Sequence, residues 1–131
     1  MDPATFDNKK SSYTEYFRLS AFYAEKYGPN TVLLLQVGAF FEIYATRTPD
    51  GAYTRSRIVD VCTICGGLHI AEKKYMHGAD MIVMAGFRDY NLDKYVQTIV
   101  DADFTVVVYV QKETEQGEFT REHAGTYSPG T

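Results

Sequence analysis

Apolar and polar positions follow a helical period at the start of the chain and strand-like runs after it. Apolar and aromatic residues recur at helical spacing over residues 13–27, and Gly28-Pro29 stops that pattern. Residues 31–37 form a near-continuous apolar run of strand length, which predicts a strand buried on both faces. Gly38-Ala39 interrupts the run, and residues 40–44 resume as a second strand. The first third of the chain therefore predicts a helix followed by two strands.

The second half of the chain contains shorter runs with clear turn signals between them. Residues 46–56 contain Pro49-Asp50-Gly51, which indicates a turn or an insertion, and residues 68–80 are ambiguous. The other segments, in chain order, are a β-branched apolar run over 58–64 ended by Gly66-Gly67, a buried strand over 81–85 ended by Gly86, a helix over 92–100 capped by Asn91, a β-branched strand over 105–110, and a return strand over 119–127.

This order of elements predicts one α/β (α+β) domain. We expect a mixed β-sheet of about five or six strands flanked by helices, because strands and helices alternate along the chain. Residues 1–12 are polar and contain Pro3, so they are expected to form a flexible leader, with the domain spanning residues 13–131. The length of 131 residues suits a single core.

Composition places the chain among ordinary globular proteins. It is 45% hydrophobic and 23% charged, which excludes a disordered or collagenous chain. Two cysteines are too few for a disulfide framework, so an intracellular setting is expected. No apolar run is long enough to span a bilayer, and the polar opening is no secretory signal, so no membrane partner is expected.

Charge is unevenly distributed and limits where DNA could be contacted. The formal net charge of −4 argues against a strongly basic nucleic-acid coat. Residues 88–131 hold four Lys/Arg against eight Asp/Glu, while residues 1–87 are close to neutral. A DNA contact is therefore expected from a small patch within residues 31–90. The basic side chains that could reach phosphates there are Arg47, Arg55, Arg57, Lys73, Lys74 and Arg88, most of which are expected to be solvated surface instead.

The sequence proposes no reaction. It has no Gly-x-x-x-x-Gly-Lys-Ser/Thr phosphate loop, no Gly-x-Gly-x-x-Gly, no Gly-x-Ser-x-Gly and no His-Glu-x-x-His. We therefore expect no enzyme activity, no catalytic residue and no cofactor in these 131 residues.

A Cys-x-x-Cys pair raises an alternative, a small zinc-binding domain. Cys62 and Cys65 are followed by His69 and His77, and zinc binds four such ligands tetrahedrally. Cys62 lies inside an apolar run, however, where a reduced cysteine acts as a small hydrophobic side chain. The structural interpretation is favoured, and no metal ligand is assigned.

Phe40 and Glu42 form the most informative pair. Strand alternation places both on one face, with Phe41 on the other. A ring that projects there can wedge into a weakened base step, while the carboxyl contacts the displaced base. Spacing alone favours a core phenylalanine beside a solvated glutamate.

Four segments in order resemble the N-terminal mismatch-recognition domain of the MutS DNA mismatch-repair family. They are Tyr13-Thr14-Glu15-Tyr16-Phe17, the run from Leu33 to Tyr44 with its Phe-x-Glu, Met84-Ala85-Gly86-Phe87, and Ser128-Pro129-Gly130-Thr131. Residues 45–80 match poorly. Ala39 stands where the family usually has an acid, and Phe41 where tyrosine is common, which suggests a divergent member.

The resemblance implies a mixed-sheet domain that contacts DNA at the lesion. Phe40 would be the stacking wedge, Glu42 the carboxylate on the mismatched base, and Met84 a neighbour of that site. The implied partners are mismatched double-stranded DNA and the remaining domains of a dimeric, ATP-binding parent. This chain would be a domain excised from such a parent, an interpretation favoured over a stand-alone relative of the family. An alternative is a structural or protein-interaction domain that keeps the fold without mismatch reading. Side chains of Phe40 and Glu42 that project together from an exposed edge favour the first interpretation, and buried ones the second.

Overall fold

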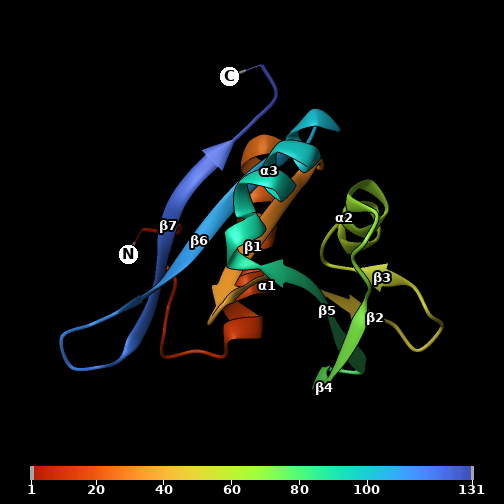
Figure 1. Cartoon of the computed structure of the whole chain (residues 1–131). Helices are drawn as coiled ribbons and strands as arrows, with labels where there is room; N and C mark the ends of the chain where they lie inside the picture. The colour runs from red at the N-terminus through yellow and green to blue at the C-terminus, as the bar shows by residue number, and fades with distance from the viewer. Residues whose placement is uncertain (1, 131) are drawn as a thin grey trace.

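A twisted mixed sheet runs through the domain (Figure 1), and the structure, a computed structural model, describes residues 2–130. Its strands lie in the order β4-β5-β2-β1-β6-β7, and short β3 pairs with β2. Neighbours pair antiparallel except β1 and β6, which are parallel. The strands are β1 (Thr31–Val37), β2 (Phe40–Arg47), β3 (Tyr53–Thr54), β4 (Ala71–His77), β5 (Asp80–Arg88), β6 (Thr105–Glu113) and β7 (Phe119–Tyr127). The predicted mixed sheet flanked by helices is confirmed. Strands β3 and β4 lie in segments for which the sequence pattern predicted no strand.

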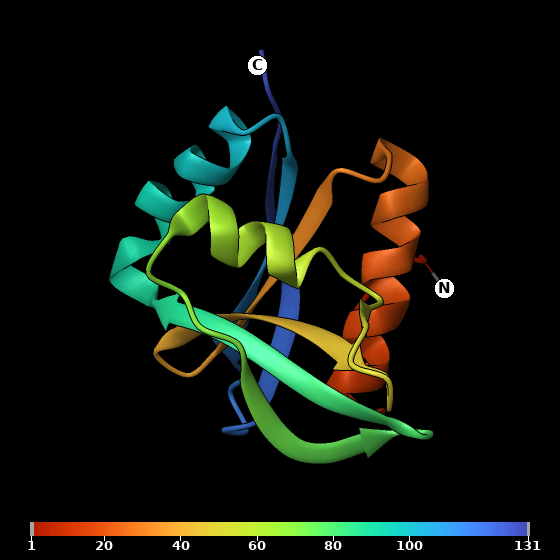
Figure 2. The same ribbon diagram turned by 90° about the vertical axis from the view of Figure 1, so that its right-hand side faces the viewer.

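Helices cover both faces of the sheet (Figure 2). Helix α1 (Ser12–Tyr27) packs on one face, where the Tyr16 ring meets Tyr44 of β2 at 5.0 Å between centroids. Helices α2 (Ile58–Cys65) and α3 (Leu92–Asp101), the latter preceded by a 3₁₀ turn (Asp89–Asn91), lie on the other face. There the rings of Tyr95 and Phe87 lie 4.3 Å apart. None of the helices within residues 2–130 has both the length and the apolar character needed to cross a membrane.

The sheet is buried on both faces at its centre. Residues 31–35 of β1 and 106–109 of β6 are buried, which explains why these strands read as continuous apolar runs rather than as alternating ones. The strands predicted over residues 31–37, 40–44, 105–110 and 119–127 are confirmed, and so is the helix that begins after Asn91.

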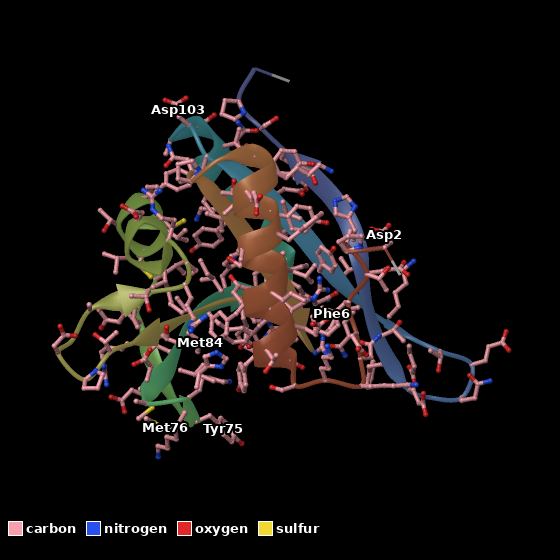
Figure 3. The ribbon with its side chains drawn as sticks, turned by 180° about the vertical axis from the view of Figure 1, so that it is seen from behind. Asp2, Phe6, Tyr75, Met76, Met84 and Asp103 are labelled. Atoms are coloured by element: carbon pink, nitrogen blue, oxygen red, sulfur yellow. The ribbon has the colours of Figure 1, made fainter. Side chains whose placement is uncertain are left out.

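One predicted strand end is wrong, and two segments that the sequence left without an assigned element take a definite form. The β-branched run from Ile58 forms helix α2, because Ile58 and Val61 lie one turn apart and both pack fully into the core. Gly86 does not end its strand, since β5 continues to Arg88. The ambiguous residues 68–80 include strand β4, which returns as β5 through a turn at Gly78. The hairpin tip exposes Tyr75 and Met76 (Figure 3).

The segment expected to be a flexible leader packs along the domain. Phe6 is buried near Tyr109, between α1 and the β6–β7 hairpin (Figure 3). Arg18 of α1 donates to the carbonyl oxygens of Pro3 and Thr5. The backbone N–H of Asp7 donates to Glu15 Oε1 at 2.7 Å. The polar composition of the segment did not predict this anchoring.

Glu15 couples this anchoring to pH. Its side chain is buried and accepts hydrogen bonds from Arg18, which lower the pKa of the carboxyl below its usual value of 4.5 against the opposing effect of burial. A depressed pKa in the folded state stabilises the fold above pH 4.5, and this stabilisation is lost as the pH falls through the folded-state pKa.

We therefore expect Glu15→Gln to lower the free energy of unfolding by about 2 kcal/mol at pH 7 and to reduce the loss of stability between pH 5 and about 3. Urea denaturation at several pH values measures both effects. Glu25→Gln, a change of an exposed glutamate on the same helix, is the control and should alter neither. Parallel pH profiles for Glu15→Gln and the wild type would contradict the assignment.

Candidate functional site

A two-residue turn presents Phe40 at the edge of the sheet. Val37 pairs with Phe40, so Gly38 and Ala39 alone connect β1 to β2, and Gly38 takes the positive φ of 59° that favours glycine at the first position of such turns. The turn is fixed from both sides. The N–H of Gly38 donates to Gln111 Oε1 at 3.0 Å, and the carbonyl of Ala39 accepts from the N–H of Asp89 at 2.8 Å.

One face of β2 and β5 carries the predicted site residues. Phe40, Glu42 and Tyr44 alternate onto the same face of β2, as predicted, while Phe41 lies on the other and is buried. Their cross-strand partners on β5 are Arg88, Gly86 and Met84. Met84, the partner of Tyr44, therefore lies on the same face of the sheet as Phe40 and Glu42.

Gly86 leaves space over Glu42. A Cβ at position 86 would meet the carbonyl oxygen of Phe41 at 2.9 Å and Cγ of Glu42 at 3.4 Å, so glycine is required there. This explains why β5 runs through a glycine that the sequence pattern treats as a strand end.

A hollow of about 420 Å³ occupies this part of the face. Strand residues form one side of it, and the loop between α2 and β4 forms the other. The lining residues are Phe40, Glu42, Gly67, Leu68, His69, Met84 and Gly86. Glu42 is the buried member of this lining, so the hollow has an apolar wall and a carboxylate at its floor.

Glu42 is held by a buried phenol. Its Oε1 accepts a hydrogen bond from the hydroxyl of Tyr44. The rings of Tyr13 and Tyr16 each lie edge-on to Tyr44 at 5.0 Å. Burial first, and then the hydrogen bond to Glu42, raise the pKa of Tyr44, so the phenol stays protonated and acts as the donor.

The structure separates the predicted pair by exposure. Phe40 is 45% exposed and projects, as the wedge interpretation expects. Glu42 is 8% exposed and does not project with it from an open edge; its carboxylate accepts a hydrogen bond from the Tyr44 hydroxyl at the floor of the hollow. The carboxylate is accessible through the hollow rather than at the rim.

The structure gives the zinc alternative no ligand cluster. Between residues 2 and 130 no group of three or more His, Cys, Asp or Glu side chains is placed to hold a metal ion. Cys62 and Cys65 lie on α2, and burial raises the pKa of both thiols, that of Cys65 to about 11. His77 packs on the Phe17 ring at 5.2 Å, while His69 lines the hollow.

Sequence reasoning missed part of the hollow. Gly86 and Tyr44 share the face of Glu42, and extending the period-2 alternation along both strands could have found them. Leu68 and His69 reach the hollow from a loop, and no local pattern marks them.

Comparisons with known proteins agree on one family. The sequence model of MutS domain I matches residues 18–131. A mutS homolog of Acanthamoeba polyphaga mimivirus, named as a DNA mismatch repair protein, is 32% identical over 136 residues, which cover 95% of this chain and 11% of that protein. The DNA mismatch repair protein MutS of Acaryochloris marina is 29% identical over 108 residues, which cover 79% of this chain and 11% of that protein. The DNA mismatch repair protein MutS 1 of Halobacterium salinarum is 32% identical over 100 residues, which cover 76% of this chain and 10% of that protein. The chain thus spans about a tenth of the length of these relatives.

Adding a methyl group at Gly86 should close the hollow. We expect Gly86→Ala to lower the free energy of unfolding by about 1–3 kcal/mol, because the new Cβ presses on the β2 backbone. Urea denaturation measures the change. Gly67→Ala is the matched control, since a Cβ there meets no atom within 4 Å and should cost less than 1 kcal/mol. Equal costs at both positions would contradict the steric explanation.

Removing the Tyr44 hydroxyl should expose how much Glu42 depends on it. Tyr44→Phe should cost about 1.5–3 kcal/mol of unfolding free energy, because a buried carboxylate loses its donor. In a Glu42→Leu background, which lacks the acceptor, the same change should cost close to nothing. A double-mutant cycle by urea denaturation gives the coupling, and additive costs would show that the hydrogen bond does not matter.

Proposed function

The chain belongs to the MutS family as its domain I, and from this membership we propose that it recognises mispaired bases in double-stranded DNA by inserting Phe40, with no catalysis of its own. The exposed Phe40 ring at the rim of a hollow with a carboxylate floor carries the proposal. The turn before it is fixed by hydrogen bonds to Gln111 and Asp89, which set where Phe40 starts β2.

The proposed discrimination is energetic. A mispaired step costs less to unstack than a paired one, so a ring that must enter the stack binds better where the stack is weak. Base–ring stacking is worth about 1–3 kcal/mol, which corresponds to roughly 5–150-fold in affinity.

The hollow next to Phe40 suits a displaced base. Met84 and Leu68 supply apolar walls, and Glu42 supplies acceptor oxygens at the floor. The Tyr44 hydroxyl uses one carboxylate oxygen of Glu42 and keeps the side chain in one orientation. In this proposal the ring opens the step and the carboxylate contacts the base edge, with Met84 beside them.

The match covers only 10–11% of each relative named above, so we place the domain within a longer MutS-like parent. The expected ATP-binding and dimer-forming parts belong to that parent. A net charge of −4 leaves this chain few phosphate contacts, and its own DNA affinity should be weak.

The burial of Glu42 favours one alternative, a domain of the same fold that makes protein contacts without mismatch reading. The two functions separate in one measurement, because only mismatch reading requires tighter binding to a mispaired duplex than to its matched counterpart.

We expect Phe40→Ala to remove the preference for mismatched DNA while leaving binding to matched duplex nearly unchanged. Nuclear magnetic resonance titration of this 14.8 kDa chain with two duplexes that differ only by one mispair measures weak affinities directly. Phe119→Ala, which removes an even more exposed phenyl ring from β7, is the control and should keep the preference. Equal losses on both duplexes, or no preference in the wild type, would contradict the proposal and favour the alternative.

A further inference from the structure

Arg88 ends β5 directly beside the proposed wedge. It pairs across the sheet with Phe40, so both side chains leave the same face at the same end of the site. Its guanidinium lies 5.5 Å from the centre of the Phe40 ring and 5.3 Å from that of the Tyr90 ring. Both rings are exposed, Tyr90 to 74%. Arg88 is thus a surface cation that lies over two exposed aromatic rings.

The charge of Arg88 has no acidic partner. Among residues 2–130, carboxylates lie within 4.0 Å of other cations, namely Arg18, Arg47, Arg57 and Lys112. Among the same described residues no carboxylate lies within 4.0 Å of Arg88, although Asp89 follows it and Glu42 lies two pairs along the strands.

A guanidinium that lies over aromatic rings can still bind an anion through its N–H donors. Aromatic contacts use the faces of the group and leave its N–H donors in the plane, where they match the two oxygens of a phosphate. B-DNA carries one phosphate charge per about 1.7 Å of its axis, so a duplex that admits the Phe40 ring must also bring phosphates to a cation 5.5 Å from that ring.

We propose that Arg88 binds a DNA backbone phosphate next to the step that Phe40 enters, and that Tyr90 holds the guanidinium in place for it. This rests on the proposed function for its choice of partner. The contact carries no base information, so it strengthens binding to matched and mismatched duplexes alike and sets the position of the wedge on the backbone.

The experiment is a salt series of the same titration. Each phosphate contact contributes about 0.9 to the slope of log affinity against log salt. Arg88→Met keeps the length of the side chain but removes the charge, and should lower the slope by about 0.9 on both duplexes. The wild type should then lose about eightfold more affinity than Arg88→Met over a tenfold rise in salt. Arg88→Lys keeps the charge and should keep the slope.

Arg55→Met is the matched control. Arg55 also lies over an aromatic ring, Phe17 at 5.9 Å, and also has no carboxylate within 4.0 Å among the described residues. It follows β3, which pairs with the opposite end of β2 from Phe40. Its substitution changes net charge equally but should leave the slope at the wild-type value.

The outcomes separate the phosphate contact from mismatch reading. An unchanged slope in Arg88→Met, with mismatch preference intact, would overturn the Arg88 proposal alone. If Arg88→Met lowers the slope but the wild type shows no mismatch preference, the result would support the phosphate contact and overturn the proposed function. An equal loss in Arg55→Met would show a diffuse charge effect and overturn the Arg88 site, and no binding of either duplex at low salt would overturn both.

Discussion

The side chain that Gly86 lacks gives this face of the sheet its shape. Directly paired residues in antiparallel strands normally bring two Cβ atoms within about 5 Å of each other and fill the space between them. At the pair of Glu42 with Gly86 one side is empty, and the backbone of β2 is too close to accept a methyl group. The pairs on either side, Phe40 with Arg88 and Tyr44 with Met84, keep their side chains. A hollow with defined walls follows from one missing Cβ.

Burial of Glu42 beneath that space changes what the carboxylate can do. A carboxylate removed from water needs a replacement partner, and Tyr44 supplies a phenol that is itself fixed by the rings of Tyr13 and Tyr16. Burial lowers the pKa of the nearby Arg121, and the smaller opposing effects of Tyr44 and Glu42 only partly offset this. The carboxylate is therefore a preoriented acceptor rather than a mobile surface charge, which suits contact with a group that enters the hollow.

Charge and shape divide their roles in the proposed function. Most arginines outside the site already bind carboxylates or carbonyl oxygens, and the chain is acidic overall, so electrostatic attraction to DNA is small. Selectivity then depends on how easily a base step admits the Phe40 ring. In this proposal the domain's own affinity for DNA is low, and the longer parent provides most of the backbone contacts.

The local sequence pattern determined the elements with strong periodicity. It also determined which side chains of one strand share a face of the sheet. The strands around Gly38-Ala39, the helix after Asn91 and the shared face of Phe40 and Glu42 all follow from spacing, because side-chain direction along a strand or helix is a local property. A seven-residue apolar run such as 58–64 fits a strand and a buried helix equally well, and only packing against α3, β2 and β5 made Ile58–Cys65 a helix. Burial depth was likewise decided by distant parts of the chain, since α1 brings the rings around Tyr44 and the loop after α2 brings Leu68 to the hollow. Sequence spacing could place Phe40 and Glu42 side by side, but which of them faces solvent depended on what the tertiary structure packs over each.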